Sequence, residues 1–461
     1  MTTHKNGFPG TLRVLLVALL SPGAWAAIPV QQWTQPSGVQ VYLVESHAIA
    51  MVDLQIDFDA GSRRDPVAQA GLASVTAGMA SKGVLAGKPA GASGAAESAL
   101  DENGLSEAWA DLGASFGAGA SPDRMSFSLR SLTYPDLLSK AVQLAARQLG
   151  EPAFPQEVWL RERERLNAGI KESNTRAATV AGRAFAAAVY GQHPYGFEMT
   201  EASLAGIGVA DMKRLYTRLI TPCRAKVSIV GAVTRAQADQ LVSELFSRLA
   251  QAASPGAGCP ALAAVPEIAP LGQSVERRIG FDSAQAHVLL GQPGYKRDDP
   301  DFFALTVGNY ILGGGGFVSR LTAEVREKRG LSYSVYSYFS PGLHAGAFTL
   351  GLQTRPDQAT QALEVSREVL ARFVQDGPTQ GELEAAKSNL LGGFALLIDS
   401  NRKLLGNLSN IAWNRLPLNY LDTWTQQIDK VTLADIRAAF ARKLQPEHMV
   451  VVVVGATPAA N

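Results

Sequence analysis

The sequence predicts an α+β protein of two homologous halves, each a mostly antiparallel sheet covered by helices, joined by a linker into a clamshell. The first observation is an ungapped internal match between Val209–Gly231 and Leu433–Gly455. Each copy has an amphipathic helix, a proline stop and an apolar strand that ends in glycine. A second pair, Phe127–Asp136 and Phe348–Asp357, repeats a strand that ends in a Thr-x-Pro-Asp turn. Both pairs are separated by nearly the same length of chain, so the repeat is a whole domain and not a short-period solenoid.

The composition between the repeats predicts the domain boundaries. The segment Gln251–Gln273 is rich in proline, glycine and alanine and has no periodicity, as interdomain linkers do. We therefore predict an N-terminal domain over residues 28–250, a linker over 251–273 and a C-terminal domain over 274–456. The segment Leu85–Leu100 is predicted as an exposed loop that opens a helix.

The N-terminus has the features of a secretory signal peptide over residues 1–26. Lys5 and Arg13 precede the apolar run Val14–Leu20, and a small-residue Ala-x-Ala site follows at residues 24–26. The run is shorter than a membrane-spanning helix requires. A buried N-terminal helix is the alternative, but the three features occur in the order of a signal peptide. We expect an exported chain that begins near Ala27, and this type of site favours a bacterial periplasm.

The bulk composition excludes several function classes. With 46% hydrophobic and 18% charged residues the chain is an ordinary globular protein. A formal net charge of +1 predicts no nucleic-acid partner and no binding to anionic membranes. The later apolar run Val450–Val454 has the length of a strand, so no membrane span is predicted. Cys223 and Cys259 could pair in an exported protein, but two cysteines carry no framework signal and are too few for a zinc site.

The segment Ala60–Val84 resembles the signature segment of the pitrilysin/insulinase family of zinc metallopeptidases. It has a Gly-Ser turn, an acidic-proline step, Gly-Leu-Ala and a Lys-Gly close, carried by Gly61, Ser62, Pro66, Gly71, Leu72, Ala73, Met79, Lys82 and Gly83. In that family an inverted zinc motif, H-x-x-E-H, follows Gly-Leu-Ala. Ser74, Ala77 and Gly78 stand at its three chemical positions in this sequence.

The zinc chemistry of the family requires side chains that these positions lack. Two histidines at i and i+4 share one zinc ion, and the glutamate between them acts as general base on zinc-bound water. Alanine and glycine carry no ligand, and a lone serine hydroxyl is a poor one. The resemblance places the family's third ligand, a glutamate on a later helix, near Lys171, with Glu172 adjacent. One carboxylate cannot build a site, so we predict that this chain binds no metal.

The histidines offer no replacement zinc site. The chain has six of them, namely His4, His47, His193, His287, His344 and His448. Of these, His4 leaves with the signal peptide and no remaining pair has ligand spacing. His193 lies in a His-Pro-Tyr-Gly segment that resembles a family turn, and we predict a structural turn histidine there.

The segment Leu312–Ser337 contains four consecutive glycines, but no G-K-[ST] follows, which excludes a phosphate loop. We interpret it as a hinge that lets two elements approach closely. Its G-G-G, S-R-L and R-E-x-x-G-L-x-Y pattern resembles the C-terminal-half signature of the same family. That resemblance implies that Arg326 and Tyr333 reach across to a zinc site, hold the substrate backbone and support the oxyanion. Taken alone, Arg326 would be a solvated helix end and Tyr333 a packed strand residue.

The resemblance extends from about Val30 to Gly455. Some family members work as two different chains, so we predict the non-catalytic, substrate-binding subunit of a heterodimeric zinc metallopeptidase for short or unfolded peptides. Its partner would be a homologous subunit that carries H-x-x-E-H and the zinc. No activity is expected from the chain alone. A catalytically dead peptide-binding or scaffold protein is the alternative, and an independent peptidase with a relocated metal conflicts with the histidine inventory.

Overall fold

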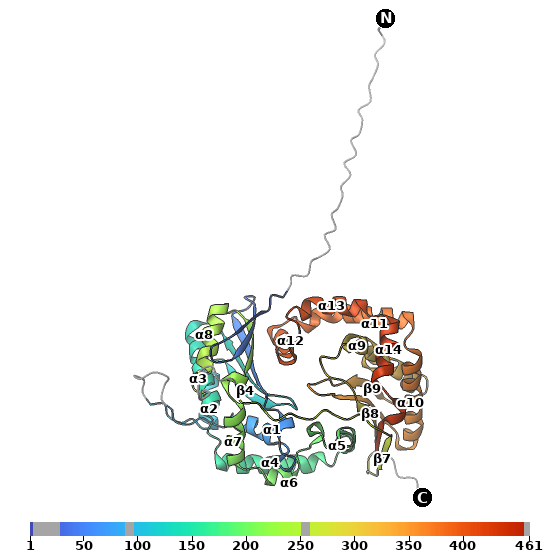
Figure 1. Ribbon diagram of the computed structural model, residues 1–461, viewed down its shortest axis with the longest axis horizontal. Coiled ribbons are helices and arrows are strands. Elements are labelled where there is room, and N and C mark those ends of the chain that lie inside the picture. Colours follow the sequence, from blue (N-terminus) through green and yellow to red (C-terminus); the bar gives the residue numbers. More distant parts are fainter. Residues whose placement is uncertain (3–27, 88–95, 250–258, 456–461) are drawn as a thin grey trace.

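The computed structural model describes residues 1–2, 28–87, 96–249 and 259–455. Nearly all of the predicted signal peptide lies outside these residues, and so do the middle of the predicted exposed loop and residues 251–258 of the predicted linker. The chain forms two sheets with their helices, one half beside the other (Figure 1). The predicted α+β architecture of two halves is confirmed.

The N-terminal sheet has six strands in the order β1-β2-β6-β3-β5-β4. Neighbouring strands are antiparallel, except that β2 and β6 are parallel. The strands are β1 (Gln31–Thr34), β2 (Gln40–Glu45), β3 (Met51–Phe58), β4 (Ser115–Ala120), β5 (Met125–Leu132) and β6 (Lys226–Gly231).

The C-terminal sheet has five strands in the order β7-β11-β8-β10-β9, again with one parallel pair, β7 and β11. The strands are β7 (Val275–Ile279), β8 (Ala286–Pro293), β9 (Ser334–Phe339), β10 (Ala347–Thr354) and β11 (Val450–Val454). Apart from the extra β1, the two sheets correspond strand by strand, with β4 and β9 as equivalent edge strands.

The helices of the two halves correspond in part. The N-terminal half has α1 (Leu72–Met79), α2 (Glu102–Asp111), α3 (Pro135–Gly150), α4 (Gln156–Ser173), α5 (Ala177–Tyr190), α6 (Glu201–Ala205), α7 (Val209–Leu219) and α8 (Arg235–Leu245). The C-terminal half has α9 (Phe302–Asn309), α10 (Ala359–Asp376), α11 (Gln380–Gly393), α12 (Asn401–Asn414), α13 (Tyr420–Lys430) and α14 (Leu433–Lys443), with π-helical segments η5 (Tyr310–Gly314) and η7 (Thr322–Glu327). The unit α7–β6 repeats as α14–β11, and β5–α3 repeats as β10–α10, which confirms the repeat predicted from the sequence.

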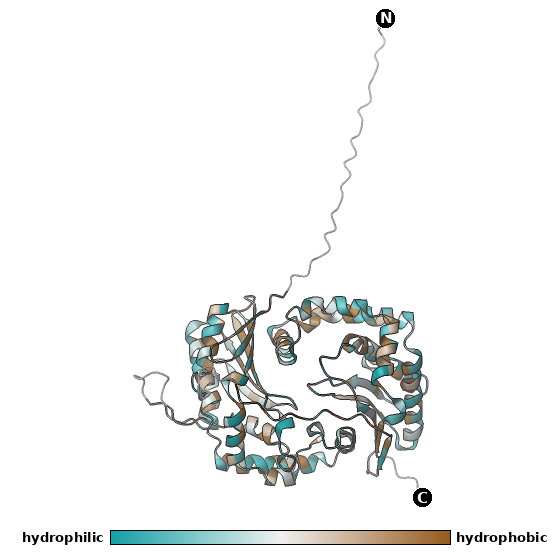
Figure 2. Ribbon diagram, viewed as in Figure 1, coloured by the Kyte–Doolittle hydropathy of each residue, from teal (hydrophilic) through white to brown (hydrophobic). Residues whose placement is uncertain are grey.

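Each half has its own core between the sheet and the outer helices. Apolar residues gather on the strands and on the helix sides that face them, whereas polar residues cover the outward sides (Figure 2). This arrangement follows from the amphipathic periodicity of the helices, because burying one apolar stripe removes it from water.

The inner face of each sheet is covered by one helix from the opposite half. Helix α5 packs on β8 and β11 of the C-terminal sheet, and α12 packs on β3 and β6 of the N-terminal sheet (Figure 1). In β11, Val450, Val452 and Val454 contact the α5 layer, while Val451 and Val453 enter the outer core. Burial on both faces explains why this strand is continuously apolar and does not alternate.

A buried polar cluster anchors α12 to the N-terminal sheet. Asp57 of β3 is fully buried and accepts hydrogen bonds from Arg124 Nη1 at 2.9 Å and from Ser409 Oγ of α12 at 2.8 Å. Lys226 Nζ of β6 donates to the Ala412 carbonyl near the C-terminal end of α12 at 2.7 Å. Burial lowers the pKa of this lysine to about 8. The cluster orders α12 relative to the sheet because each buried charge has a partner.

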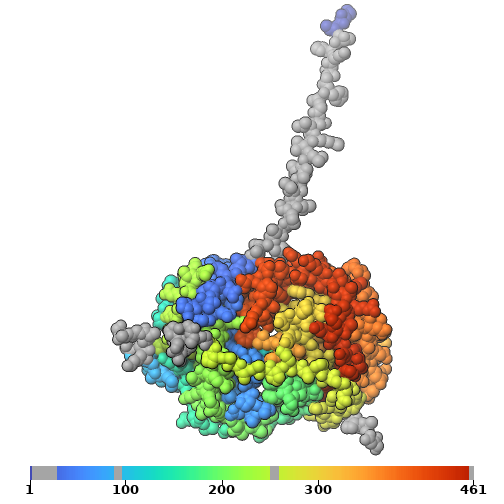
Figure 3. Space-filling model, viewed as in Figure 1, coloured from blue at the N-terminus to red at the C-terminus, as the bar shows by residue number. Residues whose placement is uncertain are grey.

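The two cysteines, whose pairing the sequence left open, form a disulfide bond between Cys223 and Cys259. It ties the start of the described linker to the N-terminal half. From there the linker crosses between the halves on the face shown in Figure 3, in yellow-green. Arg64 Nη1 donates to the Ala263 carbonyl, and Glu267 pairs with His344 Nδ1 of the C-terminal half at 3.2 Å. In the described part of the chain, no helix has the length and apolar character that crossing a membrane requires.

Candidate functional site

Asp65 positions helix α1, which carries the altered zinc-motif positions. Its two carboxylate oxygens accept hydrogen bonds from the backbone N–H groups of Gly71 and Ala73, each at 3.0 Å. Burial raises the pKa of Asp65 to about 7, against the opposing effect of these hydrogen bonds. Gly71 has a φ of 101°, which favours glycine at the residue before the helix. The family-like flank is therefore an N-terminal cap.

The three motif positions face different surroundings. Ser74 and Gly78, one turn apart, are exposed and line a pocket of about 390 Å³. A side chain added at Gly78 would enter open space. Ala77 is fully buried in the core. Zinc does not fit these residues, because one serine hydroxyl is their only side-chain donor. Within the ranges that the structure describes, no group of three or more His, Cys, Asp or Glu side chains could hold a metal ion.

The carboxylate that faces this pocket is Glu162 of α4, not a residue near Lys171 as predicted. Glu162 and Lys171 are nine residues apart, which puts them on opposite faces of the helix at 3.6 residues per turn. Lys171 instead pairs with Glu201 at 3.3 Å, and Glu172 pairs with Arg176 on the exposed side.

Three cations surround the Glu162 carboxylate, and the most distant is Arg161, whose Nη2 lies 3.9 Å from Oε1. Lys82 Nζ lies 3.5 Å from Oε1, and Arg165 Nε donates to Oε2 at 2.8 Å. Burial opposes ionisation here, but the hydrogen bond from Arg165 and the charge of Lys82 hold the pKa of Glu162 below its usual value. Protein cations therefore compensate this carboxylate, which has no need of a metal for its charge.

The structure brings Arg326 and Tyr333 together. Arg326 lies on η7, and Tyr333 immediately precedes the edge strand β9 with 79% of its surface exposed. The Arg326 guanidinium carbon lies 5.1 Å from the centre of the Tyr333 ring and 4.8 Å from that of Phe317. All three line a pocket of about 650 Å³. Sequence reasoning missed Phe317, although an exposed aromatic residue directly after four glycines was a signal for it.

The glycines allow a close approach, as interpreted from the sequence. A Cβ atom at Gly313 would lie 2.5 Å from Ser337 N of β9, so only glycine lets η5 approach the strand this closely. Gly316 has a φ of 62°. Asn309, a second residue missed from the sequence, exchanges hydrogen bonds with Ser337 through Nδ2 at 3.0 Å and Oδ1 at 2.8 Å. These contacts set the position of the Arg326 pocket relative to β9.

His193 is a turn residue, as predicted. Its Nδ1 accepts a hydrogen bond from Tyr195 N at 3.1 Å, and its ring contacts that of His344 with 5.1 Å between the centres. Burial, followed by the nearby His344, lowers the pKa of His193. This histidine joins the two halves and lies in neither pocket.

The pocket at Ser74 and the pocket at Arg326 share no lining residue. Arg326 and Tyr333 therefore do not line the same pocket as the altered zinc-motif positions of their own chain. The Arg326 pocket is a basic and aromatic surface beside an edge strand, and none of its lining residues is a His, Cys, Asp or Glu.

Comparisons with known proteins show which family the chain resembles. A family model described as the peptidase M16 inactive domain matches residues 206–390, which include Arg326 and Tyr333. The crystal structure of a peptidase M16 inactive domain from Pseudomonas fluorescens is 34% identical, with a TM-score of 0.84, and the match covers 94% of this chain and 99% of that one.

Curated relatives match over shorter stretches. An uncharacterized zinc protease of Mycobacterium leprae is 33% identical over 56% of this chain and 57% of that protein. A non-peptidase homolog of Helicobacter pylori is 36% identical over 35% of this chain and 37% of that protein. This chain thus spans only about a third to three fifths of these two relatives. The chain belongs to the peptidase M16 (pitrilysin/insulinase) family, as a non-catalytic member without the zinc motif.

Proposed function

We propose that this chain is the substrate-binding, non-catalytic subunit of a two-chain zinc peptidase that degrades short or unfolded peptides. A homologous partner with an intact H-x-x-E-H motif would hold the zinc. The observation that carries the proposal is the Arg326–Tyr333 pair, which is assembled on an open pocket in a chain whose own motif positions offer no zinc ligands.

The surroundings of the pair suit this role. Among the described residues Arg326 makes no ion pair, so its fixed N–H donors remain available to a peptide carbonyl. Its neighbours Lys328 and Arg329 instead both pair with Glu324. The exposed Tyr333 hydroxyl can donate a hydrogen bond to an oxyanion that forms on a facing subunit. The bound substrate would lie beside β9.

The location of the complex belongs to the same proposal. Basic residues, a short apolar run and an Ala-x-Ala site at the N-terminus support export, and the bacterial periplasm is the compartment we propose. In this arrangement the partner binds zinc and this chain binds none.

The test is peptide hydrolysis by the assembled pair. The tagged chain is purified with its homologous partner, and kcat/KM is measured with a fluorogenic short peptide. We expect Tyr333→Phe to lower kcat/KM by about 10²–10³-fold, the usual effect of losing one oxyanion donor. Arg326→Ala removes the donors that hold the substrate backbone, so it should also lower kcat/KM.

The matched control is Arg329→Ala, three residues further along the chain. It removes the same charge, but Arg329 pairs with Glu324 and does not line the pocket. This variant should hydrolyse peptide at the wild-type rate. Unchanged hydrolysis in Arg326→Ala would overturn the proposal. Recovery of the chain alone, or in an unrelated assembly, would instead support the scaffold alternative.

A further inference from the structure

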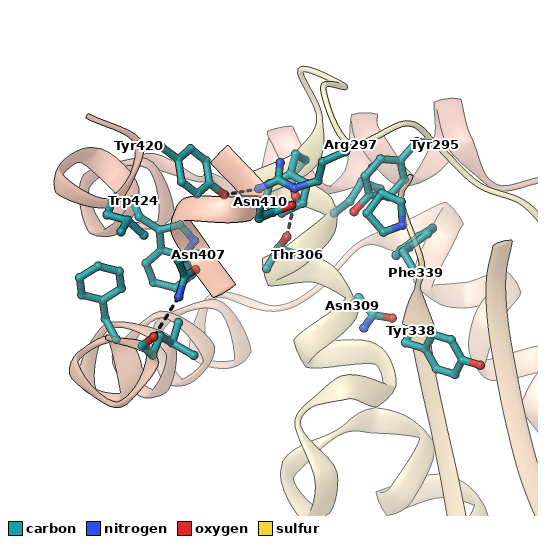
Figure 4. Close-up of a pocket in the computed structure, with 16 residues that line it drawn as sticks. Tyr295, Arg297, Thr306, Asn309, Tyr338, Phe339, Asn407, Asn410, Tyr420 and Trp424 are labelled. Carbon is teal, nitrogen blue, oxygen red and sulfur yellow. Dashed lines mark hydrogen bonds between the residues drawn. The ribbon is translucent and has the colours of Figure 1, made fainter. Parts of the chain in front are cut away.

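Arg297 is a buried arginine without a carboxylate partner in the described chain. Only 8% of the residue is exposed, and it forms no ion pair with a described residue. Its guanidinium makes one hydrogen bond, from Nη2 to Tyr420 Oη at 2.7 Å (Figure 4). Burying an unpaired charge is costly, so the lack of a carboxylate calls for a physical reason.

The position of the guanidinium is well determined by its contacts. The Arg297 backbone N–H donates to the Gly342 carbonyl at 2.9 Å. The guanidinium carbon lies 3.8 Å from the centre of the Phe302 ring and 5.2 Å from that of Tyr420. These aromatic faces stabilise the cation in part, but they leave its remaining N–H donors without an acceptor among the described residues.

Of the three acidic residues that follow Arg297 within four positions, Asp298 is exposed and forms no ion pair with it, and the other two are engaged elsewhere. Asp299 pairs with Lys443, and Asp301 accepts from Arg442 Nη2 at 2.6 Å. Neither carboxylate is available to neutralise Arg297. The Arg297 charge is therefore unpaired although carboxylates lie close to it in the sequence.

The Arg297 side chain lines a pocket of about 450 Å³, which is large enough for one or two amino-acid residues (Figure 4). Among its sixteen lining residues Arg297 is the only one with a formal charge. The apolar walls come from α9, β9 and α13, and include Phe302, Leu305, Phe339, Leu421 and Trp424. Asn410 of α12 adds an amide whose Nδ2 donates to no described residue, while its Oδ1 accepts from Asn414.

We propose that this pocket binds the terminal carboxylate of a peptide whose last side chain is apolar. A guanidinium presents parallel N–H donors that match the two oxygens of a carboxylate, which supplies the missing counter-charge. The aromatic and aliphatic walls bury the last side chain of the peptide.

The choice of a peptide terminus rests on the proposed function. The pocket shares Asn309 and Tyr338 with the pocket of Arg326, so the two adjoin along β9. From Tyr333 to Tyr338 an extended chain spans about 17 Å at about 3.3 Å per residue. A peptide bound in both pockets would therefore have its C-terminus about five residues beyond the peptide residue that contacts Tyr333. This geometry selects short substrates with a free C-terminus.

The first test uses the purified wild-type chain without any partner, so its outcome is independent of peptidase activity. Binding of the hexapeptide Lys-Ala-Ala-Ala-Ala-Phe is measured by calorimetry, once with a free and once with an amidated C-terminus. The free acid should bind about tenfold tighter or more, because only it forms the charge-assisted hydrogen bonds. Equal affinity of the two peptides would overturn the proposal. So would tight binding of an amidated peptide ending in Glu, which would indicate an acidic side chain as the ligand.

Variants assign the effect to this residue. Arg297→Gln should abolish the preference for the free acid, and Arg297→Lys should retain part of it as a point charge. The matched control is Arg372→Gln, an exposed arginine outside the pocket, which should keep the full preference. A full preference in a folded Arg297→Gln would overturn the assignment. If Arg297→Gln does not fold, the affinities of the free and the amidated peptide for the wild-type chain still test the proposal.

The two proposals fail in distinguishable ways. If Arg326→Ala leaves hydrolysis unchanged while the free acid still binds preferentially, only the role of the Arg326–Tyr333 pair is wrong. If hydrolysis depends on Arg326 but both peptide termini bind equally, only the carboxylate pocket is wrong.

Discussion

At the scale of single residues, helix α1 shows how a site can lose its chemistry while its helix persists. Leu72, Val75 and Met79 are buried in the core, whereas Ser74 and Gly78 face solvent. Folding stability depends mainly on the buried face, because burial of apolar area stabilises the fold. The solvent face was therefore free to change without unfolding the protein.

We expect His193 to make the free energy of unfolding depend on pH. Its ring lies near His344, Glu267 and Asp123, and burial followed by the charge of His344 lowers its pKa below the usual value for histidine, about 6.5. Below that value the unfolded chain binds more protons at this site than the folded chain does, so stability falls as the pH falls. Above it both states are neutral and this contribution vanishes.

We expect His193→Gln to flatten this dependence. The free energy of unfolding in urea is measured for both proteins between about pH 7 and about pH 5. The wild type should lose more stability across that interval than the variant. Parallel curves would show that His193 does not cause the pH dependence.

At the scale of elements, the exchanged helices hold the two halves together. Each of α5 and α12 belongs in sequence to one half and packs on the sheet of the other. The approach of α5 is close, since a Cβ atom at Gly291 of β8 would lie 2.8 Å from the Phe185 ring. Relative motion of the halves would uncover both apolar faces, so the exchange resists it.

Arg124→Ala tests how much the polar anchor of α12 contributes. The variant leaves the fully buried Asp57 without its cation, and breaking a buried ion pair costs about 3–5 kcal/mol. We expect the free energy of unfolding to fall by about 3 kcal/mol, measured by urea denaturation. The control is Lys403→Ala, which removes an exposed pair with Asp399 beside the same helix and should cost less than about 0.5 kcal/mol. Similar losses in the two variants would contradict the anchoring role.

At the scale of the whole molecule, the Cys223–Cys259 disulfide restrains the chain between the halves. The two cysteines are 36 residues apart, and closing a loop of this length stabilises the folded state by about 4 kcal/mol in the chain-entropy estimate. The double variant Cys223→Ser/Cys259→Ser should lose about this amount in urea denaturation. The wild type treated with a reductant should approach the stability of the variant. If the reduced wild type and the variant are both as stable as the untreated wild type, the disulfide bond contributes nothing to stability.

The sequence alone determined the features that can be read within one element or one contiguous block. The repeat of α7–β6 as α14–β11 appears in aligned letters, and so does the absence of zinc ligands at Ser74, Ala77 and Gly78. The block that contains Arg326 and Tyr333 is equally local, because both residues lie on adjoining segments.

Only the tertiary structure decided which distant segments meet. The Cys223–Cys259 pairing, the exchange of α5 and α12, and the partners of Arg297 each join segments remote in sequence. Packing also decided which face of α4 is turned toward α1. For this reason the carboxylate at the altered zinc-motif pocket is Glu162 and not a residue near Lys171, as the sequence predicted. Helical periodicity defines faces within a helix but not which neighbour each face meets, because that choice depends on the packing of the whole chain.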